Sequence, residues 1–158
     1  MNHLHNNKSE QTTDSSFTLD IEQLLKQGNV IRIKPQGTSM YPLFVPGRDE
    51  ACIERTDFSS LKRGDVILYR RDKSILVLHR IWKITNNSFY MVGDNQTEIE
   101  GPLRGDQVRG KLTAFVHNGK FVNVKNPIYR FTSSLWLFLR PLRPCFWKLM
   151  SFLRKRQH

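Results

Sequence analysis

Residues 62–84 read KRGDVILYRRDKSILVLHRIWKI. This stretch holds two apolar runs, Val66–Tyr69 and Ser74–Ile84, which are rich in β-branched and aromatic residues and are separated by a short polar connection. A Gly64-Asp65 turn leads into the first run. Runs of this length and composition, bounded by turn residues, are typical of β-strands. The stretch therefore predicts two strands, and it sets the pattern for the middle of the chain.

The same pattern continues on both sides, from Asn29 to Val124. Gly, Asn, Asp or Pro separates the runs, and Asn118-Gly119 is a strong hairpin signal because both residues tolerate positive φ. We predict a mainly β fold with mostly antiparallel strands, preceded by a short helix over Thr18–Gln27 that Gly28 ends. The further strands are expected at Val30–Ile33, Ala51–Glu54, Ser88–Val92, Gln107–Val116 and Lys120–Val124, with Asn86-Asn87 as a second hairpin connection.

The charge of the chain is unevenly distributed. The 158 residues carry a formal charge of +11, yet Asp106 is the last acidic residue, so the 11 basic residues that follow it account for the whole excess. An anionic partner is therefore expected at the C-terminal part. Cys52 and Cys145 lie far apart and are predicted to be free thiols, and no metal or cofactor motif is present in the sequence.

Three segments are expected: a disordered polar tail over residues 1–17, a β domain over 18–126 and a basic amphipathic helical segment over 127–158. Met1–Ser16 has neither the basic start nor the apolar core of a signal or anchor, and no uncharged apolar run reaches about 18 residues. Prolines divide the C-terminal segment into helical stretches near 129–139 and 144–155. This segment suits a membrane interface, and equally a helix packed on the β domain with a solvated basic end.

Four local features bear on chemistry. Gly37-Thr38-Ser39-Met40-Tyr41-Pro42 places a serine hydroxyl in a turn, where it can be presented to a carbonyl or can simply form the turn. His79 lies on an apolar strand, where limited water lowers its pKa and favours the neutral base, although strand histidines are also commonly structural. Gly93-Asp94-Asn95 is followed by Glu98 and Glu100, and Arg63-Gly64-Asp65 enters a strand.

The order and spacing of these features resemble the signal peptidase I family over about half of the chain, from Val30 to Phe115. That family shows a Gly-x-Ser-Met-x-Pro box, an Arg-Gly-Asp-Val strand entry, the general base and a Gly-Asp-Asn loop. All four occur here in that order. His79 stands where the bacterial housekeeping enzymes have a lysine, so the chain looks closer to the endoplasmic-reticulum and archaeal type.

The resemblance implies that Ser39 attacks the scissile carbonyl and that His79 accepts its proton. A carboxylate would orient the histidine, and Glu100, Asp94 and Asp106 all remain candidates for this role. The Ser39 amide would donate to the oxyanion, but Gly37 replaces a serine that often donates a second hydrogen bond, which leaves Thr38 as a candidate. The substrate would be an extended peptide that adds along a strand edge.

The expected function is therefore a serine endopeptidase that cleaves a signal- or leader-type peptide from a precursor, with a dedicated precursor favoured over general export. We expect the protein at a membrane surface, through residues 128–156, or in the cytoplasm. The alternative is a noncatalytic relative whose basic C-terminal segment binds an anionic membrane or nucleic acid, with nucleic acid the less favoured partner.

Overall fold

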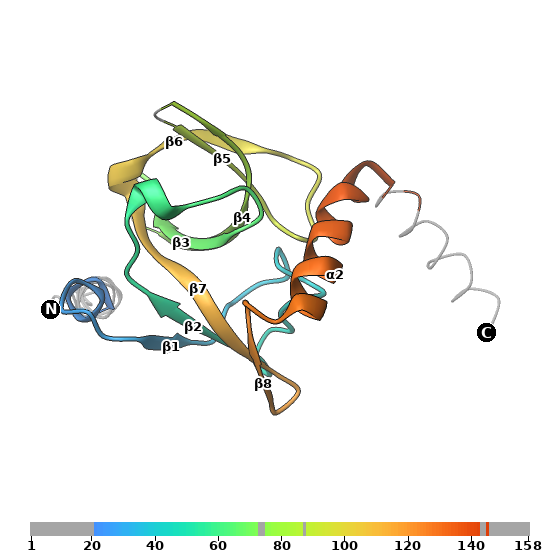
Figure 1. Cartoon of the computed structure of the whole chain (residues 1–158), viewed down its shortest axis with the longest axis horizontal. Helices are drawn as coiled ribbons and strands as arrows, with labels where there is room; N and C mark the ends of the chain where they lie inside the picture. The colour runs from blue at the N-terminus through green and yellow to red at the C-terminus, as the bar shows by residue number, and fades with distance from the viewer. Residues whose placement is uncertain (1–20, 73–74, 87, 143–144, 146–158) are drawn as a thin grey trace, which may run out of the picture.

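The computed structural model describes residues 21–72, 75–86, 88–142 and 145. One antiparallel sheet joins all the strands in these residues, with β8 paired to β7 outside the main order β1-β2-β7-β3-β4-β5-β6 (Figure 1). The strands are β1 Ile31–Ile33, β2 Glu50–Glu54, β3 Val66–Arg70, β4 Leu76–Thr85, β5 Ser88–Val92, β6 Glu100–Arg104, β7 Val108–His117 and β8 Lys120–Asn123. Short 3-10 turns lie at Phe58–Ser60, Gly105–Gln107 and Arg140–Leu142.

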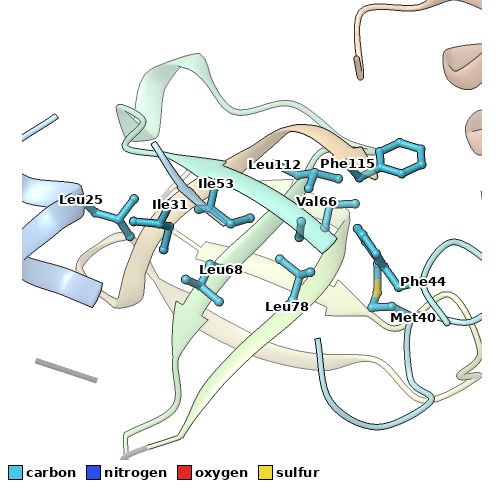
Figure 2. Packing of buried hydrophobic residues seen from close by; sticks show 11 residues of the cluster. Leu25, Ile31, Met40, Phe44, Ile53, Val66, Leu68, Leu78, Leu112 and Phe115 are labelled. Carbon is cyan, nitrogen blue, oxygen red and sulfur yellow. The ribbon is translucent and has the colours of Figure 1, made fainter. Parts of the chain in front are cut away.

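The curved sheet buries apolar side chains in two clusters. The first lies between the sheet, the N-terminal helix and the turn after β1, and Figure 2 shows its members converging from these elements. The second cluster contains Ile67, Tyr69 and Ile81, together with side chains from β5 and β6. Neighbouring residues of β3 alternate between the clusters, since Leu68 belongs to the first. Because both faces are covered, β3 is apolar along its whole buried length.

The predicted strands and hairpins are confirmed. Asn118 and Gly119 have φ angles of 49° and 76°, as a two-residue turn of the favoured hairpin type requires. Thr85 pairs with Ser88 across the other predicted hairpin connection. The mainly antiparallel β fold that the runs indicate is therefore the fold of the described residues.

Strand β6 was not predicted. Its Gly101-Pro102 pair gives the segment the composition of a loop, because proline cannot donate a hydrogen bond to a sheet. The strand lies at the edge of the sheet, where proline is tolerated, and it pairs with β5 so that Met91 lies opposite Glu100. Glu100 is thereby held on a strand rather than in the acidic loop that the sequence suggests.

The helices agree with the sequence where they are described. The N-terminal helix covers residues 21–26 of the described chain, and Gly28 follows it with φ +84°, its amide donating to the carbonyl of Leu25. This geometry confirms Gly28 as the residue that ends the helix. The first residues of the predicted helix and the tail over 1–17 lie outside the described residues.

Helix α2 spans Pro127–Phe138 and overlaps the first predicted C-terminal stretch. Asn126 caps it by accepting hydrogen bonds from the amides of Ile128 and Tyr129. The second predicted stretch, near 144–155, lies outside the described residues except for Cys145, so the basic helical segment as a whole stays a prediction. In the described part of the chain, no helix is long and apolar enough to cross a bilayer.

Candidate active site

A cavity of about 880 Å³ brings together two of the predicted site residues. Ser39 and His79 both line it, although they are 40 positions apart in the sequence. One wall consists of β1 and the turn that follows it, and the other of residues 75–79 at the start of β4. Arg71, Leu68 and Gln96 also contribute to the lining.

Apolar packing and backbone hydrogen bonds both hold the turn that carries Ser39. Buried Met40 and Phe44 anchor it in the first apolar cluster, and the amide of Phe44 donates to the carbonyl of Met40 over 2.9 Å. The amide of Asn95 donates to the carbonyl of Ser39 over 2.8 Å. Ser39 itself is only half-buried, so its hydroxyl can meet a substrate while its backbone is held.

Gly93 allows the Gly-Asp-Asn loop to approach the serine turn this closely. A Cβ atom at position 93 would lie 2.6 Å from the carbonyl oxygen of Ser39, which is closer than real Cβ contacts come. A glycine is therefore required where the two loops meet. The serine box and the Gly-Asp-Asn loop, separated by more than 50 residues in the sequence, form one structural unit.

The Arg63-Gly64-Asp65 turn joins the same unit through β4. The amide of Gly64 donates to the carbonyl of Ile81, and the amide of Ile81 donates to the carbonyl of Asp65. The Asp65 carboxylate accepts from the amide of Lys62 over 2.9 Å and so caps the turn. This turn extends the pairing of β3 with β4 just beyond His79.

His79 is 3% exposed on β4. Burial has the largest influence on its pKa and holds it below the ordinary value of histidine, although the negative charge of Glu100 opposes this effect. The imidazole is therefore neutral near pH 7, which agrees with the sequence-based expectation. A neutral imidazole can accept a proton, as a general base must.

Tyr69 and Glu100 complete the surroundings of the imidazole. The Tyr69 hydroxyl lies 3.1 Å from Nδ1 of His79 and donates to Oε2 of Glu100 over 2.7 Å. The carboxylate itself is 3.8 Å from Nδ1, so the phenol lies between the neutral imidazole and the carboxylate. Arg71 also donates to Glu100 over 2.6 Å.

These contacts determine which nitrogen of His79 carries the proton. Burial and then Glu100 raise the pKa of Tyr69, so the phenol stays protonated. Burial would raise the pKa of Glu100, but hydrogen bonds from Arg71 and Tyr69 outweigh it and keep the carboxylate ionised. Because the phenol proton goes to Glu100, the Tyr69 oxygen accepts from Nδ1–H of His79. Nε2 is then the unprotonated nitrogen.

The structure places the other two candidate acids away from His79. Asp94 forms a buried ion pair with Arg80, the neighbour of His79 on the opposite face of β4, with 2.7 Å between Nη2 and Oδ2. Asp106 is exposed and pairs with Arg104. Of the three acids that the sequence left open, Glu100 is the one whose contacts lead to the imidazole.

Three residues of this site were not expected from the sequence: Tyr69, Arg71 and Gln96. Tyr69 reads as an ordinary strand residue, and its phenol on an otherwise apolar face was the only signal. It meets His79 because Ile67 pairs with His79 and Tyr69 with Val77, which makes the two residues diagonal neighbours. Among the described residues, the cavity lining includes Gln96 but not Thr38, the predicted second oxyanion donor.

Part of the chain is similar in sequence to a known protein. No protein-family profile matches the chain. Signal peptidase I W of Bacillus subtilis (strain 168) is 34% identical over 82 residues. The chain is thus similar to a signal peptidase. The match covers 49% of this chain and 43% of the relative, so the chain spans less than half the length of the signal peptidase that it matches. The similarity supports the signal peptidase I family resemblance; it does not distinguish the histidine type from the lysine type.

Proposed function

We propose that the chain is a serine endopeptidase that removes a signal- or leader-type peptide from a precursor, with Ser39 as nucleophile and His79 as general base. The observation that carries this proposal is that both side chains line one cavity while Nδ1 of His79 is engaged by Tyr69. A serine needs an adjacent base to attack a carbonyl at neutral pH, and a histidine with one nitrogen occupied is oriented for that task.

The reaction proceeds in two halves. The Ser39 Oγ attacks the scissile carbonyl carbon, and its proton passes to Nε2 of His79. The imidazolium then returns this proton to the departing amine as the peptide bond breaks, which leaves an acyl-enzyme. Water then attacks the carbonyl carbon of the acyl-enzyme and gives a proton to the same nitrogen. The imidazolium passes this proton to Ser39 Oγ as the ester bond breaks, which releases the acid and restores the serine. Glu100 stabilises the imidazolium through Tyr69, because the phenol oxygen accepts from Nδ1–H while its proton is shared with the carboxylate.

The strand edges at the cavity support an extended substrate. Residues 76–79 of β4 pair with β3, whereas β5 pairs only with later residues of β4, from Arg80 onward. On the opposite wall, β1 lies at the end of the sheet order and pairs with β2. A peptide backbone between these two edges would add hydrogen bonds to each, with small side chains entering beside Ser39. Ile33, Met40 and Leu78 would provide the apolar surface for them.

The oxyanion would accept from the Ser39 amide and from the side-chain amide of Gln96. Gln96 lines the cavity with Ser39, and its own backbone amide donates to the carbonyl of Gly93, which anchors it beside the serine turn. Loss of one such donor lowers kcat by about 10²–10³-fold in other serine enzymes. Replacing Gln96 by alanine should therefore lower kcat much more than the change Thr38→Val; equal effects would assign the donor elsewhere.

Cleavage of a panel of precursor peptides by the full chain tests the function. The parent should cut at least one precursor, and Ser39→Ala and His79→Ala should each reduce the rate by about 10³-fold or more. Ser134→Ala changes an exposed serine on α2 and serves as the matched control, which should cut at the parental rate. Cleavage by either site variant at the rate of the parent, or no Ser39-dependent cleavage of any precursor, would contradict the proposal.

A further inference from the structure

Helix α2 has an apolar side that the β domain leaves uncovered. Phe131 is 69% exposed and Phe138 is 76% exposed, although both are large aromatic residues. We call the exposed apolar residues of α2 and of the turn that follows it the outer stripe. Its members, at spacings of three and four residues that place them on one helical face, are Ile128, Phe131, Leu135, Phe138 and Leu142.

The opposite side of α2 is bound firmly to the sheet. Tyr129 packs against Phe115 of β7 with 5.2 Å between ring centroids, and Leu137 is buried. The indole of Trp136 donates to the carbonyl of Asp94 over 2.9 Å, and Arg80 donates to the hydroxyl of Ser133. Figure 1 shows α2 lying along one side of the sheet. Because these contacts occupy the inner side, the outer stripe cannot turn inward without breaking them.

The charged residues of the sequence that carries the outer stripe, from Lys111 onward, all have one sign. Lys125 and Arg130 are exposed at the start of α2, and no acidic residue follows Asp106 anywhere in the sequence. The last 16 residues add five more basic residues and seven of Phe, Trp, Leu, Met and Cys. A second copy of the chain would bring the same positive charge to the contact, which disfavours a dimer through this face. A surface that is apolar and negatively charged is complementary to it.

We propose that the outer stripe of α2 binds the surface of a membrane that contains anionic lipids. The 12 residues of α2 span about 18 Å, which is too short to cross the roughly 30 Å hydrocarbon core, so the helix would lie in the interface. The stripe enters the boundary between headgroups and acyl chains, and Lys125 and Arg130 meet the anionic headgroups. Arg80 and Asp94 connect α2 to the strand of His79 and the loop beside Ser39, so the bound helix holds the cavity at a set place relative to the membrane.

Flotation of the full chain with lipid vesicles tests this binding. The parent should float with phosphatidylcholine vesicles that contain phosphatidylglycerol, and raising the salt concentration or omitting phosphatidylglycerol should weaken it. The double change Phe131→Ser and Phe138→Ser should lower the partition coefficient at least about tenfold, because each buried phenylalanine contributes strongly to apolar transfer. Val30→Ser, at an exposed apolar residue before β1, is the control and should bind like the parent.

The inference does not depend on peptidase activity, since flotation measures binding alone and the exposed substitutions should leave soluble-peptide cleavage unchanged. Unaltered flotation of the double variant would overturn the proposal and assign binding to the last 16 residues. A stable dimer of the parent in solution that the same double change dissolves, without vesicle binding, would overturn it in favour of a second copy as the occupant.

Discussion

The hydroxyl of Tyr69 lies 3.1 Å from Nδ1 of His79 and is the bridge between this histidine and the carboxylate of Glu100. In a Ser-His-acid arrangement the carboxylate usually accepts directly from Nδ1. Here the phenol takes that place, with the carboxylate 3.8 Å from the ring nitrogen. Tyr69 is therefore the residue that determines the tautomer of His79, and Glu100 acts on the imidazole through it.

Replacing Tyr69 by phenylalanine should lower kcat/KM by about 10- to 100-fold, because Nδ1 loses its hydrogen-bond acceptor while Ser39 and His79 remain. Loss of that acceptor disfavours the imidazolium, so the acidic limb of the pH profile of kcat/KM should shift to lower pH. Tyr90→Phe, on strand β5, is the control and should leave both quantities unchanged. A Tyr69→Phe variant with the parental pH profile would show that the phenol has no part in orienting the base.

The stability of the fold should depend on pH through His79. Burial places the pKa of His79 in the folded chain below its value in the unfolded chain, which is about 6.5. Below that pH the unfolded chain binds the proton more readily than the folded chain does. The contribution of His79 to the free energy of unfolding is therefore fully present above about pH 6.5 and is lost as the pH falls from there through the pKa of the folded chain. Melting temperatures measured between about pH 8 and pH 5 should therefore drop less in His79→Gln than in the parent. Equal drops would mean that other groups cause the dependence.

The Arg80–Asp94 pair should be costly to break. Both side chains are 1% exposed, so Arg80→Met leaves an unpaired carboxylate in the interior and should lower the free energy of unfolding by about 3–5 kcal/mol. Urea denaturation measures this loss.

Arg104→Met removes an exposed arginine that is paired with the carboxylates of Asp72 and Asp106, and it is the matched control for this measurement. An exposed pair of this kind contributes less than about 1 kcal/mol. A loss in Arg80→Met no larger than in the control would show that water reaches the pair.

A methyl group at Gly93 should displace the nucleophile. The new Cβ would lie 2.6 Å from the Ser39 carbonyl oxygen, so the two loops must separate, and a shift of about 1 Å at a reacting group can lower the rate by roughly 10²-fold. Gly93→Ala should therefore reduce kcat far more than it reduces stability.

Gly119→Ala provides the opposite case, because it strains a positive φ in the β7–β8 turn, away from Ser39. It should cost about 1–2 kcal/mol of stability and leave kcat unchanged. If Gly93→Ala retained full activity, the contact between the loop and the serine turn would have no part in positioning Ser39.

Much of the fold could be predicted because its signals are local. Runs rich in β-branched and aromatic residues indicated the strands, and Asn118-Gly119 indicated a hairpin because few other pairs accept two positive φ angles. Strand β6 could not be predicted because Gly101-Pro102 has the composition of a loop. A proline is acceptable in this strand because the strand lies at the edge of the sheet.

The sequence by itself determined the order of the serine turn, the histidine strand and the Gly-Asp-Asn loop, and hence the candidates Ser39 and His79. Only the tertiary structure decided which partner each polar side chain has. The β3–β4 register brings Tyr69 beside His79, the β5–β6 pairing brings Glu100 to the phenol, and Arg80 takes Asp94. A shift of one residue in register would move any of these side chains to the other face of the sheet, and register depends on packing between segments distant in the chain.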